Sequence, residues 1–218
     1  MSYEEFGLNR LKLFISEEHR FGTDSLLLGQ FAAEKKADIV VDLCSGCGII
    51  PLFMFDKSPP ALAYAVELQA KATDLIERTI KANNLGGVFK VIKGDLRDNA
   101  VLRQIGRERA DLVTANPPYF IRNSGFERDA DSQKTARYDT DCTITDIVAA
   151  ADYLLKFGGC LKMCMTAPRL AECTAIMREY SLEPKKITLI PSKSSKTARL
   201  FLISGKKGGK TGVQIEWK

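Results

Sequence analysis

Short apolar runs alternate along this chain with longer segments that repeat apolar residues at helical spacing. Residues 69–83 show the helical pattern clearly, with Ala72, Leu75, Ile76 and Ile80 on one face. Because alternating strands and helices favour a parallel sheet, the pattern predicts an α/β fold with helices on both faces. Ligands in such sheets bind beyond the carboxyl ends of the strands, so functional residues are expected there.

The pattern accounts for the whole chain as one domain, residues 1–218, built on a mostly parallel seven-stranded sheet. The strands are expected at residues 38–43, 62–66, 88–92, 110–115, 160–165, 186–190 and 199–204. No internal repeat divides the sequence.

The composition is that of an ordinary globular protein, with 45% hydrophobic and 27% charged residues. No apolar run approaches the ~20 residues of a membrane helix, and the first residues lack the layout of a signal peptide. We therefore expect a cytoplasmic protein without membrane contact, whose six cysteines are reduced. Cys44 and Cys47 have the spacing of a zinc pair, but a second pair is missing and histidine occurs once, so no metal is predicted.

The net charge of +5 is unevenly distributed. From residue 185 to the end, eight lysines and one arginine oppose a single glutamate, whereas the rest of the chain is slightly acidic. A basic end of this kind favours a polyanionic partner. The alternative is a solvated surface that only keeps the protein soluble.

A glycine-containing loop, Asp42-Leu-Cys44-Ser-Gly46-Cys-Gly48, follows the first predicted strand and precedes a helix. Glycines there let the backbone turn sharply and let a ligand approach the peptide groups. Pro51 stands where a dinucleotide fingerprint would have its third glycine, so the loop does not match that fingerprint.

Three acids lie at three consecutive predicted strand ends, namely Asp42, Glu67 and Asp95. The acid after the second strand has the spacing at which a carboxylate accepts hydrogen bonds from a ribose. Three carboxylates together suit an adenosine with a positively charged tail, and they suit a pyrophosphate poorly because like charges repel. The alternative for each acid is a cap on the following helix.

The most specific motif is Asn116-Pro117-Pro118-Tyr119, directly after the fourth predicted strand. An exocyclic amine on a base is a poor nucleophile because its lone pair is delocalised into the ring. The side-chain oxygen of Asn116 and the carbonyl of Pro117 can each accept one N–H of such an amine at ~2.9 Å, and Tyr119 offers a face for stacking. The motif therefore predicts a site that reacts with planar amino groups, the alternative being a proline-rich turn.

A polar stretch at residues 120–141 follows this motif and is long for a connection in a compact domain. It mixes aromatic residues with basic ones such as Arg122 and Arg137, a composition that suits single-stranded RNA. The alternative is an insertion with no fixed role.

Together these residues resemble the Rossmann-like class I methyltransferases, which use S-adenosylmethionine (SAM). Residues 42–48 are similar to their cofactor loop, with Cys44 in place of its usual first glycine, and residues 116–119 are similar to the signature of their adenine-N6 and glutamine branches. The resemblance implies that Asn116, Pro117 and Tyr119 are catalytic. It implies that SAM is bound by Asp42, Cys44, Gly46, Gly48, Glu67, Asp95 and Asn116.

A narrower resemblance covers nearly the whole chain. Gly22-Thr23-Asp24-Ser25 and the basic end at residues 199–210 are similar to the bacterial family that methylates N6 of the adenine beside the anticodon of a valine tRNA. This implies that residues 1–37 cover the cofactor, with Gly22, Thr23 and Asp24 against its methionine end. Residues 205–218 are glycine-rich and polar enough for a flexible basic tail. RNA, and tRNA in particular, is then expected to contact Arg122, Arg137, Lys206, Lys207 and Lys210.

The sequence leaves two other functions open. The same motif could methylate a glutamine side chain of a protein, although the basic end argues against a protein substrate. The chain could also be a non-catalytic RNA-binding protein on a methyltransferase fold, although the intact Asn116 and the three acids argue against that.

Overall fold

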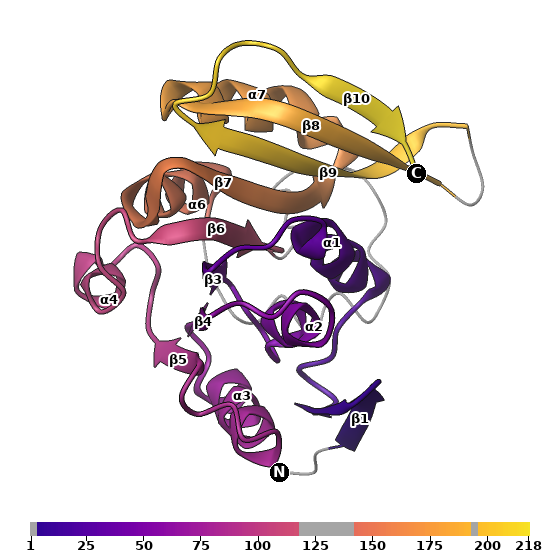
Figure 1. Cartoon of the computed structure of the whole chain (residues 1–218). Helices are drawn as coiled ribbons and strands as arrows, with labels where there is room; N and C mark the ends of the chain where they lie inside the picture. The colour runs from indigo at the N-terminus through magenta and orange to yellow at the C-terminus, as the bar shows by residue number, and fades with distance from the viewer. Residues whose placement is uncertain (1–3, 118–141, 193–195) are drawn as a thin grey trace.

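A computed structural model describes residues 4–117, 142–192 and 196–218, and its centre is an eight-stranded sheet with the order β10-β8-β9-β7-β6-β3-β4-β5 (Figure 1). The strands are β3 (Ile39–Leu43), β4 (Leu62–Glu67), β5 (Phe89–Lys93), β6 (Ala110–Ala115), β7 (Leu155–Thr166), β8 (Leu182–Pro191), β9 (Ala198–Lys207) and β10 (Gln214–Trp217). The five strands from β7 to β5 are parallel, whereas β9 runs antiparallel between β7 and β8. The predicted mostly parallel α/β sheet is confirmed, with one strand more than expected.

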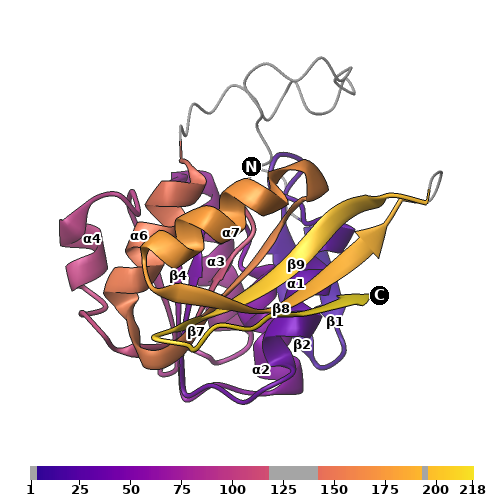
Figure 2. The same ribbon diagram turned by 90° about the horizontal axis from the view of Figure 1, so that it is seen from above.

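Helices cover both faces of this sheet (Figure 1). One face carries α1 (Thr23–Ala33), α2 (Ile49–Lys57) and α3 (Ala70–Ala82), and the other carries α4 (Asn99–Arg103), α6 (Ile144–Leu154), the short η1 (Ala167–Arg169) and α7 (Leu170–Glu179). Figure 2 shows α6 and α7 side by side over the second face. A hairpin of β1 (Glu4–Leu8) and β2 (Leu11–Ile15) packs against α3. In the described ranges, no helix is long and apolar enough to cross a membrane.

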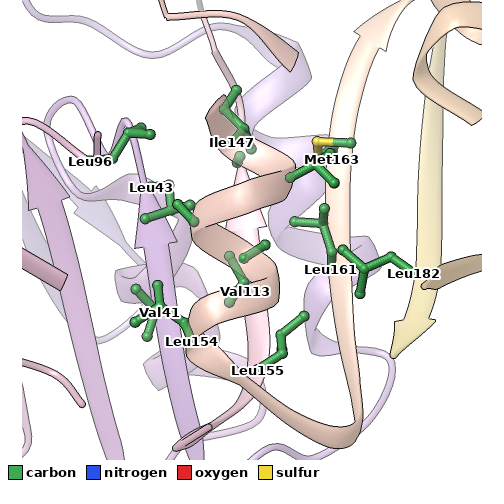
Figure 3. Packing of buried hydrophobic residues seen from close by; sticks show 14 of the residues in the cluster. Val41, Leu43, Leu96, Val113, Ile147, Leu154, Leu155, Leu161, Met163 and Leu182 are labelled. Carbon is green, nitrogen blue, oxygen red and sulfur yellow. The ribbon is translucent and has the colours of Figure 1, made fainter. Parts of the chain in front are cut away.

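The central strands are apolar throughout because both of their faces are covered. Val40 of β3 packs toward α1 and α2, whereas its neighbour Val41 points to the opposite face. There it meets Val113 of β6 beneath Ile147 and Leu154 of α6 (Figure 3), and all of these side chains are fully buried. A parallel strand buried on both faces has this continuous apolar pattern, which is why these strands were predictable.

The C-terminal end of α1 is held by a buried lysine of β7. The Lys162 ammonium donates hydrogen bonds to the carbonyl oxygens of Phe31 and Ala32 and lies 4.7 Å from the centre of the Phe31 ring. Lys162 is only 7% exposed, and burial lowers the pKa of its ammonium. The last carbonyls of a helix lack partners within the helix and carry partial negative charge, so this contact fixes α1 on the sheet.

The expectation of a flexible tail at residues 205–218 is wrong. Residues up to Lys207 complete β9, and β10 adds a parallel strand next to β8. Lys207 is an internal support, because its ammonium contacts the carbonyl oxygens of Asp152 and Leu155 at 2.6 and 3.1 Å and its side chain is 15% exposed. Glycine content alone suggested disorder, whereas the pairing of β10 with β8 depends on contacts distant in sequence.

Candidate active site

A cleft of about 290 Å³ lies at the carboxyl ends of β3, β4, β5 and β6. It is lined by the predicted residues Gly22, Asp24, Cys44, Gly46, Glu67, Asp95, Asn116 and Pro117. Thr23, Asp42 and Gly48 are not among the lining residues. Tyr119, Arg122 and Arg137 lie outside the described residues, so their roles stay predictions. In the described part of the chain, no group of three or more His, Cys, Asp or Glu side chains could hold a metal ion.

The loop after β3 follows a tight path in which Cys44, Gly46 and Gly48 all have positive φ, at 55°, 56° and 80°. Gly46 faces open space, since a Cβ there would meet no atom within 4 Å, and this leaves room for a ligand against the backbone. At Gly48 a Cβ would lie 3.1 Å from the side chain of Ile76 in α3. Gly48 therefore lets the turn before α2 pack closely against Ile76, which the sequence alone could not separate from a cofactor role.

Asp42 lies beneath this loop and is fully buried. Its carboxylate accepts hydrogen bonds from the hydroxyls of Ser45 at 2.6 Å and Thr114 at 2.5 Å. Burial raises the pKa of Asp42 to about 7, although the two hydroxyls favour the charged form. Asp42 thus connects the loop to β6 from below, and its predicted direct contact with a cofactor has no support in its position.

Glu67, at the end of β4, forms one wall of the cleft. Its carboxylate accepts hydrogen bonds from the backbone N–H of Gly46 at 2.8 Å and of Gln69 at 2.9 Å. Burial raises the pKa of Glu67, and the backbone donors lower it. Each carboxylate oxygen accepts more than one hydrogen bond, so Glu67 can still receive the hydroxyls of a nucleoside.

Asp95, after β5, is paired with a neighbour that the sequence reading missed. The Arg97 guanidinium donates to both of its oxygens, with Nη2 to Oδ2 at 2.6 Å and Nε to Oδ1 at 3.0 Å. This contact lowers the pKa of Asp95 and keeps it charged. Both side chains line the cleft, so the rim here carries a fixed ion pair in place of an isolated acid.

Two thiols meet at the same rim. Cys44 and Cys142 both line the cleft. The interaction between the two thiols raises the pKa of Cys44 and lowers the pKa of Cys142. The side chain that replaces glycine at position 44 therefore packs toward the start of α6.

The segment between β2 and α1 closes the cleft on its remaining side, through Glu18, His19, Arg20 and Phe21. Glu18 forms an ion pair of 2.8 Å with Lys71 of α3. The Nε2 atom of the buried His19 has no hydrogen-bond partner among the described residues. Burial lowers the pKa of His19, so its ring is a neutral wall of the cleft.

Asn116 follows β6 and points into the same cleft as the three preceding strand ends. Its amide Nδ2 donates a hydrogen bond of 2.9 Å to the hydroxyl of Ser25 in α1. Pro117 behind it is buried. The glycine loop, the Glu67 carboxylate and Asn116 thus line one cleft at the carboxyl ends of the strands.

The sequence profile of the methyltransferase small domain family matches residues 12–181. The chain belongs to this family. A protein from Porphyromonas gingivalis, named as a tRNA1(Val) (adenine(37)-N6)-methyltransferase, is 26% identical to this methyltransferase over 187 residues, which cover 84% of this chain and 72% of the relative. A protein of the same name from Histophilus somni is 29% identical over 186 residues, or 85% and 75% of the two chains.

Solved structures with low sequence identity confirm the fold class. TYW2 from M. jannaschii, solved in complex with AdoMet, has a TM-score of 0.63 at 15% identity and covers 94% of this chain and 85% of its own. A predicted O-methyltransferase from Agrobacterium tumefaciens has a TM-score of 0.63 at 18% identity, and the match covers 89% of this chain and 85% of that protein's chain. The Rossmann-like class I methyltransferase fold is therefore confirmed.

Asp42→Asn should change how the stability of this methyltransferase depends on pH. The native pKa of about 7 lies above the ordinary value of 3.8. The folded protein therefore binds more protons than the unfolded chain between these values, and stability falls as pH rises through the window. For each pH unit in this window, the free energy of unfolding of the wild type should fall by up to about 1.4 kcal/mol relative to that of the variant. Urea unfolding at about pH 5 and about pH 7 measures the difference.

Asp74→Asn, on the exposed face of α3, is the matched control. Its free energy of unfolding should differ from that of the wild type by the same amount at both pH values. If Asp42→Asn behaves like this control, the buried carboxylate is not the source of the pH dependence.

Proposed function

We propose that this methyltransferase transfers the methyl group of SAM to N6 of an adenine in RNA, with a tRNA near its anticodon as the substrate. The observation that carries the proposal is Asn116-Pro117 at the end of β6, in the same cleft as Glu67 and the glycine loop. The relatives named above as tRNA adenine-N6-methyltransferases support the substrate. A tRNA substrate also supports the expectation of a cytoplasmic protein.

The residues of the cleft fit SAM as the cofactor. Gly46 leaves open space beside its backbone, and Glu67 keeps acceptor capacity for ribose hydroxyls. The acidic wall suits a ligand with positive charge, and Gly22 and Asp24 also line the cleft. When bound, SAM supplies an electrophilic methyl group on a positively charged sulfur.

The chain's own contribution is to position and polarise the amine. The Asn116 side-chain oxygen and the Pro117 carbonyl accept the two N–H groups, which favours a tetrahedral nitrogen and concentrates its lone pair. Because these acceptors are fixed before the reaction, little reorganisation is needed at the transition state. The amine attacks as a neutral group, so the reaction needs no general base beforehand. Tyr119 remains the predicted stacking partner of the base.

Of the RNA contacts predicted from the sequence, Lys206, Lys207 and Lys210 lie away from the cleft. Lys206 pairs with Cys160 of β7, which lies beside Leu112 near the start of β6, whereas Asn116 follows the other end of β6. Lys206 and the turn that carries Lys210 therefore lie at the end of the strands opposite the cleft. Lys207 donates hydrogen bonds to backbone carbonyls inside the protein. Lys196 lies just before β9 and Arg199 is its second residue; both are exposed and lie at the same end of the sheet as the cleft, and we propose them as the phosphate contacts.

The decisive experiment is nucleoside analysis of tRNA and rRNA from cells with and without this gene. Loss of N6-methyladenosine from tRNA is the expected result. If the methyl acceptor in a cell extract survives RNase treatment, the protein acts on a protein amide instead. SAM binding without turnover on total tRNA would indicate a non-catalytic protein.

Asn116→Ala should lower kcat by ~10²-fold or more, because it removes a preorganised acceptor at the reacting centre. SAM affinity, measured by calorimetry, should change little. Asn99→Ala on the exposed start of α4 is the matched control and should have wild-type kcat. Near-normal turnover of the Asn116 variant would exclude the proposed mechanism.

Glu67→Ala should weaken SAM binding by ~1–3 kcal/mol, since hydrogen bonds to a charged acceptor are of this size. Glu77→Ala on the exposed face of α3 provides the comparison and should bind SAM as wild type does. Unchanged affinity in a folded Glu67 variant would leave this residue with only its structural contacts to Gly46 and Gln69.

Replacing Lys196 and Arg199 with Gln should weaken RNA binding at low salt. The slope of log K against log[salt] should shrink by ~0.7 for each lost phosphate contact, the value for single strands. Lys206→Gln with Lys210→Gln is the matched control at the opposite end of the strands and should leave the slope unchanged. Filter binding at several salt concentrations compares the two double variants. A slope reduced only by the Lys206 and Lys210 substitutions would support the RNA contacts predicted from the sequence.

A further inference from the structure

The hydrogen bond between Asn116 and Ser25 joins residues 91 positions apart in the lining of the cleft. Asn116 Nδ2 donates to Ser25 Oγ at 2.9 Å, and both residues line the cleft. Ser25 is only 8% exposed. It lies in the first turn of α1, where the helix begins after Gly22 without a side-chain cap. The Ser25 hydroxyl is therefore committed to Asn116 by position, and a capping role does not account for it.

The two ends of an asparagine amide have opposite hydrogen-bonding chemistry. A substrate amine presents N–H groups, so only the oxygen end of Asn116 can accept from it. If the amide rotated by half a turn, its NH₂ group would face the amine and donor would meet donor. A serine hydroxyl can accept from Nδ2 or donate to Oδ1, so the contact itself fixes the place of the amide. With Nδ2 toward Ser25, the oxygen faces away from α1, which is the orientation that the reaction needs.

This anchor is useful only if α1 itself cannot shift. The helix is fixed at its C-terminal end by Lys162, as described above. In its middle, Gly29 lets α1 approach α2 so closely that a Cβ would lie 3.1 Å from the Phe53 ring. Ser25 is thus presented by a helix held along its length, which gives the hydroxyl a defined place beside β6.

We propose that Ser25 is a positioning residue that holds the Asn116 amide in place and so controls the rate of methyl transfer. The inference rests on the proposed function, in which Asn116 accepts an N–H of the target amine. Ser25 does not touch the reacting nitrogen, so its substitution should lower kcat and leave the binding of both ligands unchanged.

The test compares Ser25→Ala, Ser25→Cys and Ser25→Thr, with tRNA as substrate and N6-methyladenosine as the measured product. The Ala and Cys variants lack a good oxygen acceptor, and their kcat should fall about tenfold. A loss of this size corresponds to the contribution of about one hydrogen bond to the activation free energy. The KM for tRNA and the SAM Kd from calorimetry should stay within about twofold of wild type. Ser25→Thr retains the hydroxyl and should restore most of the rate.

A double-mutant cycle shows whether Ser25 acts through Asn116. In the Asn116→Ala background, Ser25→Ala should cause no further loss of kcat, because this background lacks the side-chain amide that Ser25 holds in place. The same loss in both backgrounds, or a wild-type kcat in Ser25→Ala, would overturn the inference while the proposed function stands. A wild-type protein that forms no N6-methyladenosine would overturn the proposed function and this inference together.

Discussion

The buried carboxylate of Asp42 connects the two parts of the site from below. It accepts hydrogen bonds from the hydroxyl of Ser45, in the loop that lines the cleft, and from the hydroxyl of Thr114, two residues before Asn116. Removing one partner from a buried polar group costs more than the bond itself contributes, so both contacts must persist in the folded state. Together with the backbone pairing of β3 and β6, this side chain therefore fixes Asn116 relative to the glycine loop, although it does not line the cleft.

Other polar groups of the cleft are likewise held before any ligand arrives. Glu67 is fixed by the backbone of Gly46 and Gln69, and Asp95 is fixed by Arg97. Asn116 is fixed by Ser25. Methyl transfer to a weak nucleophile gains most from groups that need no reorganisation, and these contacts supply that rigidity. The fold thus uses hydrogen bonds outside the reacting centre to prepare the few groups inside it.

The basic C-terminal region has a more structural role than its charge suggests. Lys186 forms ion pairs with Glu34 at 3.3 Å and Glu216 at 3.1 Å. Lys185 donates to the carbonyl oxygens of Lys210 and Gly212 and so supports the turn before β10. Part of the positive charge therefore holds β8, β10 and α1 together. A count of lysines overestimates the surface available to RNA, because it does not distinguish exposed side chains from those that support the sheet.

The sequence by itself determined the order of the strands from β3 to β9 and of the helices between them, since buried parallel strands are apolar throughout and amphipathic helices repeat at a fixed period. It also determined that Glu67, Asp95 and Asn116 meet, because carboxyl ends of parallel strands share one edge. Only the tertiary structure decided that Asp42 and Gly48 serve packing, that Ser25 holds Asn116, and that Lys206 lies at the far end of the strands. These outcomes depend on burial, strand register and contacts between distant segments, which no local pattern of residues encodes.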